Sequence, residues 1–125
     1  MAYQGPKLLL EEIKSDRVIV AKRLELGIEL SSSSSTTTAA ISVEKPVTVL
    51  VSVASAGVRT LAAGYPGQVK VIFMMTDGGD IVVTPAVLAN GDTITFAEVN
   101  DCWIGIFYAG SWHTIAGTAA VSVLG

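Results

Sequence analysis

Hydrophobic and polar residues alternate along most of the chain after residue 46. In VTVLVSV, residues 47–53, every second residue is a valine, and the same period recurs in VKVIFMM (69–75) and CWIGIFY (102–108). A period of two is typical of β-strands, whose successive side chains point to opposite faces. Both faces of these strands are largely apolar, so we expect both faces to be buried.

Short turn sequences separate these strands. They are rich in glycine, proline, asparagine and aspartate, as in AGYPGQ (63–68), DGGD (77–80) and TPAVLANGD (84–92). Six or more short strands at this spacing predict an all-β fold, namely a compact antiparallel β-sandwich or barrel that is jelly-roll-like. The unpaired backbone groups at the edges of strands with so little charge can pair with another chain. This favours closure of the sheet or oligomerisation.

The N-terminal residues follow a different pattern. LELGIEL (24–30) alternates without a fault and predicts a half-buried strand, whereas residues 7–23 before it fit either a helix or a short β-run. Residues 31–38 are all serine or threonine, which favour neither a packed helix nor a central strand. We therefore predict an extended N-terminal arm with the first strand (1–30), a Ser/Thr-rich joint (31–38) and a β body (39–125).

The arm has two possible roles. It can be an ordinary first strand with a frayed tail, or a segment that docks on another protein. Thirty extended residues reach at most about 100 Å, and the apolar residues of this segment can fill grooves while its balanced charges meet polar groups. For the docking role, the residues expected to contact the partner are Tyr3, Lys7, Leu8, Leu9, Leu10, Ile13 and Arg17.

Composition and charge narrow the classes of function. The chain is 50% hydrophobic and 15% charged with a formal net charge of −3, and the β body contains few cations. Such a body offers no basic stripe for a phosphate backbone, so nucleic-acid binding is not expected. No run reaches the roughly 20 apolar residues of a membrane helix, and the N-terminus lacks the pattern of a signal peptide. The single cysteine is compatible with a reducing compartment.

Few residues offer catalytic or ligand chemistry. The single histidine, His113, lies in a short alternating strand, where a packed histidine is the simpler interpretation. Asp77 and Asp80 of DGGD can meet a cation, but a tight turn selects these residues for backbone reasons. We predict no catalytic residue, no metal and no cofactor. For the aromatic residues we expect a place in the core or a subunit interface rather than sugar stacking; these are Trp103, Phe107 and Trp112.

Residues 67–117 resemble a β-rich module of tailed-bacteriophage virion proteins, a group that includes head decoration (cement) proteins and fibres. The similar features are the Gly-Gln start, the lysine two residues later, and the stretches DGGD, VVTPA, GDTITF and GSWH. The resemblance implies a non-enzymatic, homotrimeric all-β building block, made in the host cytoplasm and carried on the capsid surface. Residues 102–108 depart from the usual form because they are unusually apolar.

Two functions fit this resemblance. A capsid decoration protein binds the outside of the head and stabilises the coat lattice, with the major capsid protein and its own copies as partners. A small fibre or host-recognition module binds a surface glycan instead. Fibres normally add a long repetitive shaft, and the sequence shows no internal repeat of 20 to 50 residues, so the decoration protein is the favoured prediction.

Overall fold

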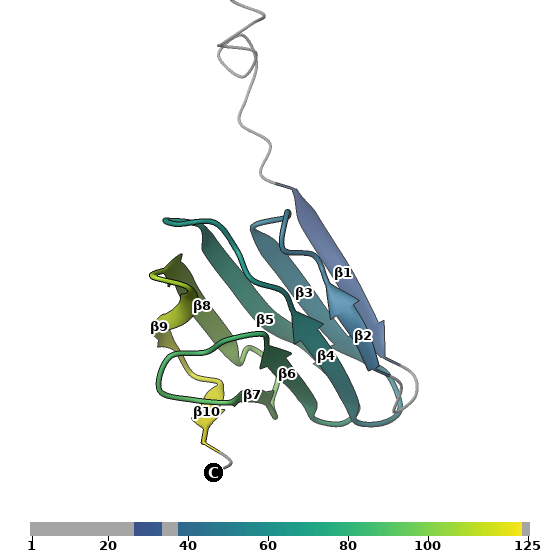
Figure 1. Ribbon diagram of the computed structural model, residues 1–125. Coiled ribbons are helices and arrows are strands. Elements are labelled where there is room, and N and C mark those ends of the chain that lie inside the picture. Colours follow the sequence, from purple (N-terminus) through teal and green to yellow (C-terminus); the bar gives the residue numbers. More distant parts are fainter. Residues whose placement is uncertain (1–26, 34–37, 124–125) are drawn as a thin grey trace, which may run out of the picture.

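Two five-stranded β-sheets packed face to face form the protein (Figure 1). The computed structural model describes residues 27–33 and 38–123, and every regular element in these residues is a strand. Sheet A contains, in spatial order, β1 (Ile28–Ser33), β3 (Val47–Ser52), β5 (Val69–Asp77), β8 (Cys102–Tyr108) and β9 (Ser111–Gly117). Sheet B contains β10 (Ala120–Ser122), β7 (Thr93–Phe96), β6 (Ile81–Pro85), β4 (Gly57–Leu61) and β2 (Thr38–Ile41). The predicted all-β sandwich is confirmed, and the sheets do not close into a barrel.

The first six strands alternate between the two sheets, so neighbours within each sheet run parallel. β1, β3 and β5 pair in parallel in sheet A, and β2, β4 and β6 do so in sheet B. The remaining pairs, which involve β7 to β10, are antiparallel. The prediction of an antiparallel, jelly-roll-like sandwich is therefore wrong for this half of the fold. A period of two is the same in parallel and antiparallel strands, so the pattern could not distinguish them.

The parallel strands form a stack of similar turns of the chain. Ile28 pairs with Val47, 19 residues later, and Val47 pairs with Val71, 24 residues later. In sheet B, Thr38, Val58 and Val82 are aligned in the same way. The backbone thus has a repeat that we did not find in the sequence, because the residues that face inward differ from one turn to the next.

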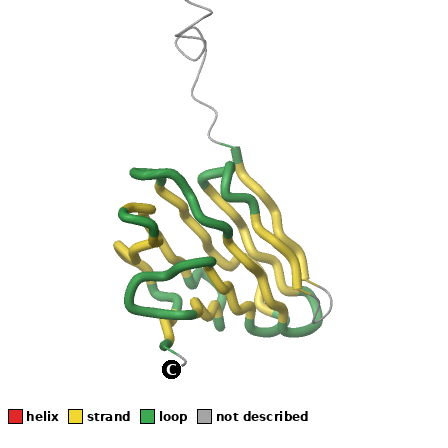
Figure 2. Tube along the Cα trace, viewed as in Figure 1, coloured by secondary structure: helices red, strands yellow, loops and turns green. Residues whose placement is uncertain are grey.

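The DGGD turn connects strands of different sheets and does not form a hairpin. It runs from β5 to β6 and packs on the connection between β3 and β4, one turn earlier in the stack (Figure 2). A Cβ at Gly78 would lie 2.4 Å from the carbonyl oxygen of Val53, and one at Gly79 would lie 2.5 Å from the backbone nitrogen of Ala56. Both positions require glycine because two backbone segments approach so closely.

The hydrophobic core lies between the sheets and is centred on the aromatic residues of β8 and β9. Trp103 and Trp112 are fully buried, and their ring centroids are 6.1 Å apart in an edge-to-face arrangement. Phe107 is nearly buried and contacts Trp112 in the same geometry at 5.2 Å. The indole N–H groups donate to Thr114 and to the carbonyl of Ala62, respectively. Of the two predicted places for these aromatic residues, the structure assigns all three to the core.

The Ser/Thr run does not form a joint over its whole length. Its first three residues complete β1, and Thr38 begins β2. The predicted strand at 24–30 is seen from Ile28 onward, after Gly27 with its positive φ of 79°. The rest of the predicted arm, including every residue expected to contact a partner, lies outside the described residues. Within the described part of the chain, no helix is long and apolar enough to cross a membrane.

Candidate functional site

The outward-facing side of sheet A is an apolar surface that extends across all five strands. Residues that alternate with the buried ones in each strand point away from sheet B, and the pairing aligns them in rows. One row runs from Ile28 through Val47, Val71 and Ile104 to Ala116. We call the whole set the outer face of sheet A: Ile28, Leu30, Ser32, Val47, Val49, Val51, Val69, Val71, Phe73, Met75, Thr76, Cys102, Ile104, Ile106, Tyr108, Ser111, His113 and Ala116.

This outer face contains no aspartate, glutamate, lysine or arginine. Much of it is accessible: Ile28 is 66% exposed, Leu30 63% and Tyr108 65%. Met75 is the extra residue of a β-bulge beside Leu50, and it too is exposed. We expected both faces of these strands to be buried. Within one chain the inner face is largely buried, whereas on the outer face Val49 alone is buried and the other residues are half-buried or exposed. A contiguous exposed apolar surface of this kind marks an interaction site.

The outward-facing side of sheet B has a different character. Five of its ten aligned positions are threonine, with Thr60 beside Thr84 and Thr95 beside Val82, and the other five are alanine, valine or serine. Threonine combines a high preference for strands with a hydroxyl group that water can solvate. Sheet B therefore has an ordinary solvated face, and the apolar character of the opposite side is specific to sheet A.

A buried lysine holds one end of the sandwich together. Lys70 in β5 points inward, and its Nζ donates to the carbonyl oxygens of Ser42 and Lys45 at 2.7 and 2.6 Å and to Oγ1 of Thr48 at 2.6 Å. The Thr48 hydroxyl in turn donates to the carboxylate of Glu29 at 2.8 Å. Burial lowers the pKa of Lys70 from 10.5 to about 8, while the charge of Glu29 acts in the opposite direction. This network fixes the connection between β2 and β3.

A buried arginine links the two sheets near the edge strands. Arg59 in β4 is 2% exposed, and its Nε donates to the Ser31 hydroxyl at 2.7 Å, while Nη2 donates to the carbonyl of Ser32 at 2.7 Å. Its Nη1 donates to the carbonyl of Val58 at 2.9 Å. A small hydroxyl-bearing residue in β1 leaves room for the guanidinium and supplies an acceptor. The start of the Ser/Thr run is thus explained by a buried cation rather than by the predicted joint.

The candidate chemical residues lie apart from one another. His113 is on the outer face of sheet A, with its ring Nε2 3.0 Å from the carbonyl oxygen of Tyr108. Asp77 and Asp80 are exposed at the DGGD turn. Asp101 accepts hydrogen bonds from the backbone N–H groups of residues 97 and 98, and these bonds lower its pKa. Among the described residues, no group of three or more His, Cys, Asp or Glu side chains could hold a metal ion.

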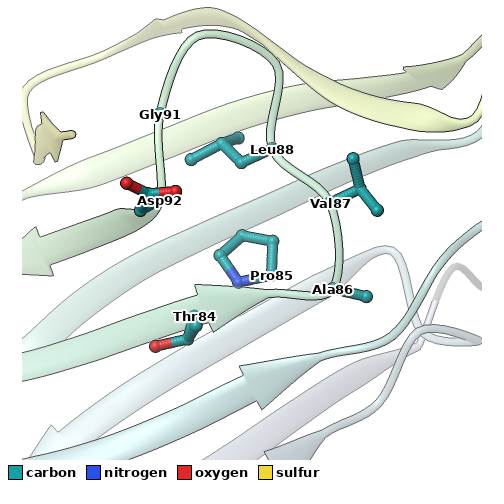
Figure 3. Close-up of a pocket in the computed structure, with 7 residues that line it drawn as sticks. All are labelled: Thr84, Pro85, Ala86, Val87, Leu88, Gly91 and Asp92. Atoms are coloured by element: carbon teal, nitrogen blue, oxygen red, sulfur yellow. The ribbon is translucent and has the colours of Figure 1, made fainter. Parts of the chain in front are cut away.

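Two hollows flank the connection between β6 and β7. The larger, of about 520 Å³, lies under the loop that arches from Pro85 to Asp92 (Figure 3). Leu88 anchors this loop by bridging to Trp112 of β9. Asp92 is the one ionisable residue among those that line the larger hollow, and the smaller hollow, beside Asn90 and His113, is about 280 Å³. Neither lining defines a ligand class.

Comparison with known proteins gives no assignment. No protein-family model, no curated protein and no solved structure matches this chain.

Sequence reasoning missed two separate sets of inward-facing charged residues, Lys70 with the half-buried Glu29, and Arg59. One signal was present: each of these residues occupies the inward-facing position of an otherwise alternating strand, as in VKVIF around Lys70. An isolated lysine or arginine in such a position means either an outward-facing residue or a buried cation with several acceptors. Here the parallel stacking supplies those acceptors from neighbouring turns of the chain, so the cations are buried.

Proposed function

We propose that this chain is a structural protein of a tailed-bacteriophage virion, a decoration protein that binds the outside of the head as a homotrimer and stabilises the coat lattice. The outer face of sheet A carries this proposal. It is apolar and uncharged across five strands, and such a surface belongs to a chain that works inside a permanent assembly. The resemblance of residues 67–117 to virion modules supports the same class.

Hydrogen bonds between distant segments of the body also favour a role in mechanical support. Arg59 ties β4 to β1 across the sandwich, and Lys70 ties β5 to the chain between β2 and β3. Each cation spans segments more than 20 residues apart in sequence. A part that stabilises a lattice must transmit force without changing shape, and such long-range links resist shear between the sheets.

A fibre or host-recognition module is the second candidate, and one observation favours it. The stack formed by β1 to β6 consists of repeated turns with parallel strands. Architectures of this kind can be extended by adding turns, as in a shaft. In that case the chain would contact a surface glycan on the host rather than the major capsid protein.

The two candidates are separated by a binding experiment with the full chain. Phage heads that lack the protein are mixed with increasing amounts of it and sedimented. A decoration protein binds saturably, and the bound heads resist heat or chelator longer than bare heads. Absence of binding to heads, together with binding to host cells that is competed by their surface glycan, would overturn the proposal in favour of the fibre module. The predicted arm contacts are tested with the triple substitution of Leu8, Leu9 and Leu10 by Ser, which should weaken head binding while the circular dichroism spectrum stays unchanged.

A further inference from the structure

We infer that the outer face of sheet A is the surface through which copies of this chain pack on one another, so that these faces meet at the centre of a homo-oligomer. The inference rests on the proposed function, which treats this face as an assembly surface. It adds that another copy of the same chain covers the face. It also distinguishes the two sides of the sandwich: sheet A is internal to the oligomer, and the threonine-bearing side of sheet B stays in water.

The chemistry of the face favours an identical partner. A chain with a net charge of −3 repels its own copies unless the contact excludes the acidic residues, and the outer face of sheet A contains none. The rows offer alternating ridges of branched side chains, as at Val47, Val71 and Ile104, which interdigitate with an equal set. Homo-oligomer interfaces are more apolar than other protein surfaces, whereas contacts with an unrelated partner use more polar and charged groups.

The size of the face is sufficient. Five strands about 4.8 Å apart and about seven residues long, at about 3.3 Å per residue, cover roughly 550 Å². Two such faces in contact remove about 1,100 Å² from water, which meets the roughly 1,000 Å² needed for a specific interface. In a trimer, as the resemblance implies, each face would be divided between two neighbours, so that each pair of copies would bury about 550 Å² and the three contacts together about 1,650 Å².

Edge strand β1 extends this argument. Ile28 and Leu30 remain more than 60% exposed at the edge of sheet A, in line with Val47 and Val49 of the next strand. Neither proline nor an outward-facing charge protects this edge in the described part of β1. Covering the face with another copy would bury these residues together with the centre of the sheet.

A matched pair of substitutions tests the inference. Val71 occupies the central strand of sheet A and Val82 the central strand of sheet B; both point outward and both are half-buried. We expect the wild type to sediment as a dimer or trimer at 10 µM. Val71→Lys should sediment as a monomer, with its dissociation constant raised at least 100-fold, whereas Val82→Lys should associate like the wild type. Both variants must give a folded circular dichroism spectrum.

Cys102 provides a second measurement that does not depend on a variant that folds. It lies on the outer face of sheet A, next to Phe73, and it is partly exposed in the single chain. In the assembled wild type, a maleimide should label Cys102 at least ten-fold more slowly than in a control sample unfolded in urea, and dilution below the dissociation constant should remove this protection.

The possible results decide between occupants. A monomeric wild type with a freely labelled Cys102 overturns the inference. An oligomer that Val71→Lys leaves intact also overturns it and moves the interface elsewhere. A monomer with a protected Cys102 assigns the face to residues of the same chain that precede Gly27. These results are independent of head binding: the oligomer can form through sheet A when heads are not bound, and heads can be bound when the face is not the interface.

Discussion

Raising the pH above 8 should stabilise this protein, because Lys70 is buried. Its ammonium group is fully inaccessible to water and donates to two carbonyl oxygens and a hydroxyl. Three donors with three acceptors satisfy the geometry of the charged form. Burial nevertheless disfavours the charge, so the pKa of Lys70 in the folded protein is lowered from 10.5 to about 8.

The sign of the pH effect follows from proton binding. Between pH 8 and 10.5 the unfolded chain keeps the proton on Lys70, and the folded protein has lost it. Stability rises with pH wherever the unfolded state binds more protons. At 1.36 kcal/mol for each pH unit, the interval from about 8 to 10.5 corresponds to about 3 kcal/mol of added stability. This contribution is complete above pH 10.5, decreases as the pH falls from 10.5 to about 8, and is absent below 8.

Urea unfolding measured between pH 7 and 10.5 tests this prediction. Other titrating groups contribute to the wild-type curve, so the informative quantity is the difference between the wild type and Lys70→Met, which retains the apolar stem. We expect this difference in the free energy of unfolding to change by about 3 kcal/mol across the interval. Lys45→Met is the matched control, since Lys45 is an exposed lysine in the same region. Its curve should run parallel to that of the wild type.

The reasoning would be refuted by a pH-independent difference. If the wild type and Lys70→Met differ by a constant amount from pH 7 to 10.5, Lys70 keeps its ordinary pKa in the folded protein. Either water then reaches its ammonium group, or Glu29 and the three hydrogen-bond acceptors offset the effect of burial.

Two further predictions concern the core and the buried arginine. Arg59→Met removes the donors to the Ser31 hydroxyl and the Ser32 carbonyl, so we expect a loss of about 2–4 kcal/mol in chemical unfolding; a loss below 0.5 kcal/mol would mean that solvent replaces the guanidinium. Trp112→Ala removes a fully buried indole and its hydrogen bond to Ala62, so we expect a loss of about 3–5 kcal/mol or failure to fold; unchanged thermal unfolding would contradict the assignment of this residue to the core.

The strands themselves could be predicted from the sequence. Alternation at 47–53, 69–75 and 102–108 placed three strands of sheet A within two residues of their observed bounds. The turn at DGGD was also in the right place. Local pattern succeeds here because each strand buries one face against the same core, and this requirement acts on every second residue.

The pairing of the strands could not be predicted. Short turns rich in glycine and aspartate are typical of hairpins, but DGGD and the connection before Gly57 lead to the other sheet. Gly78 and Gly79 of DGGD serve a close approach to the preceding connection of the stack rather than the reversal of a hairpin. The residues in that contact are more than 20 positions apart, so the local sequence pattern does not predict it.

The candidate site was predicted in part. The apolar character of both strand faces was visible in the sequence, and it implied a second layer over sheet A. What the sequence concealed is which residues face inward. The sequence showed Lys70 and Arg59 only as two of the few cations of the body, and the serines of β1 only as part of a joint, because their partners come from other turns of the stack.

In this protein some charged residues face the core, and many apolar residues of sheet A face outward. One explanation accounts for both features. Lys70 and Arg59 are buried between the sheets, and the carboxylate of Glu29 is half-buried near Lys70, while the outer face of sheet A has valines and isoleucines. Both features would lower the stability of a monomer, because buried charge opposes folding and exposed apolar surface contributes no free energy of burial. In the homo-oligomer that we propose, the apolar face would become part of a core, and the buried cations would hold the strands of the sheet that presents it. This distribution of residues is therefore the one that we expect if the proposed homo-oligomer, rather than the single chain, is the working unit.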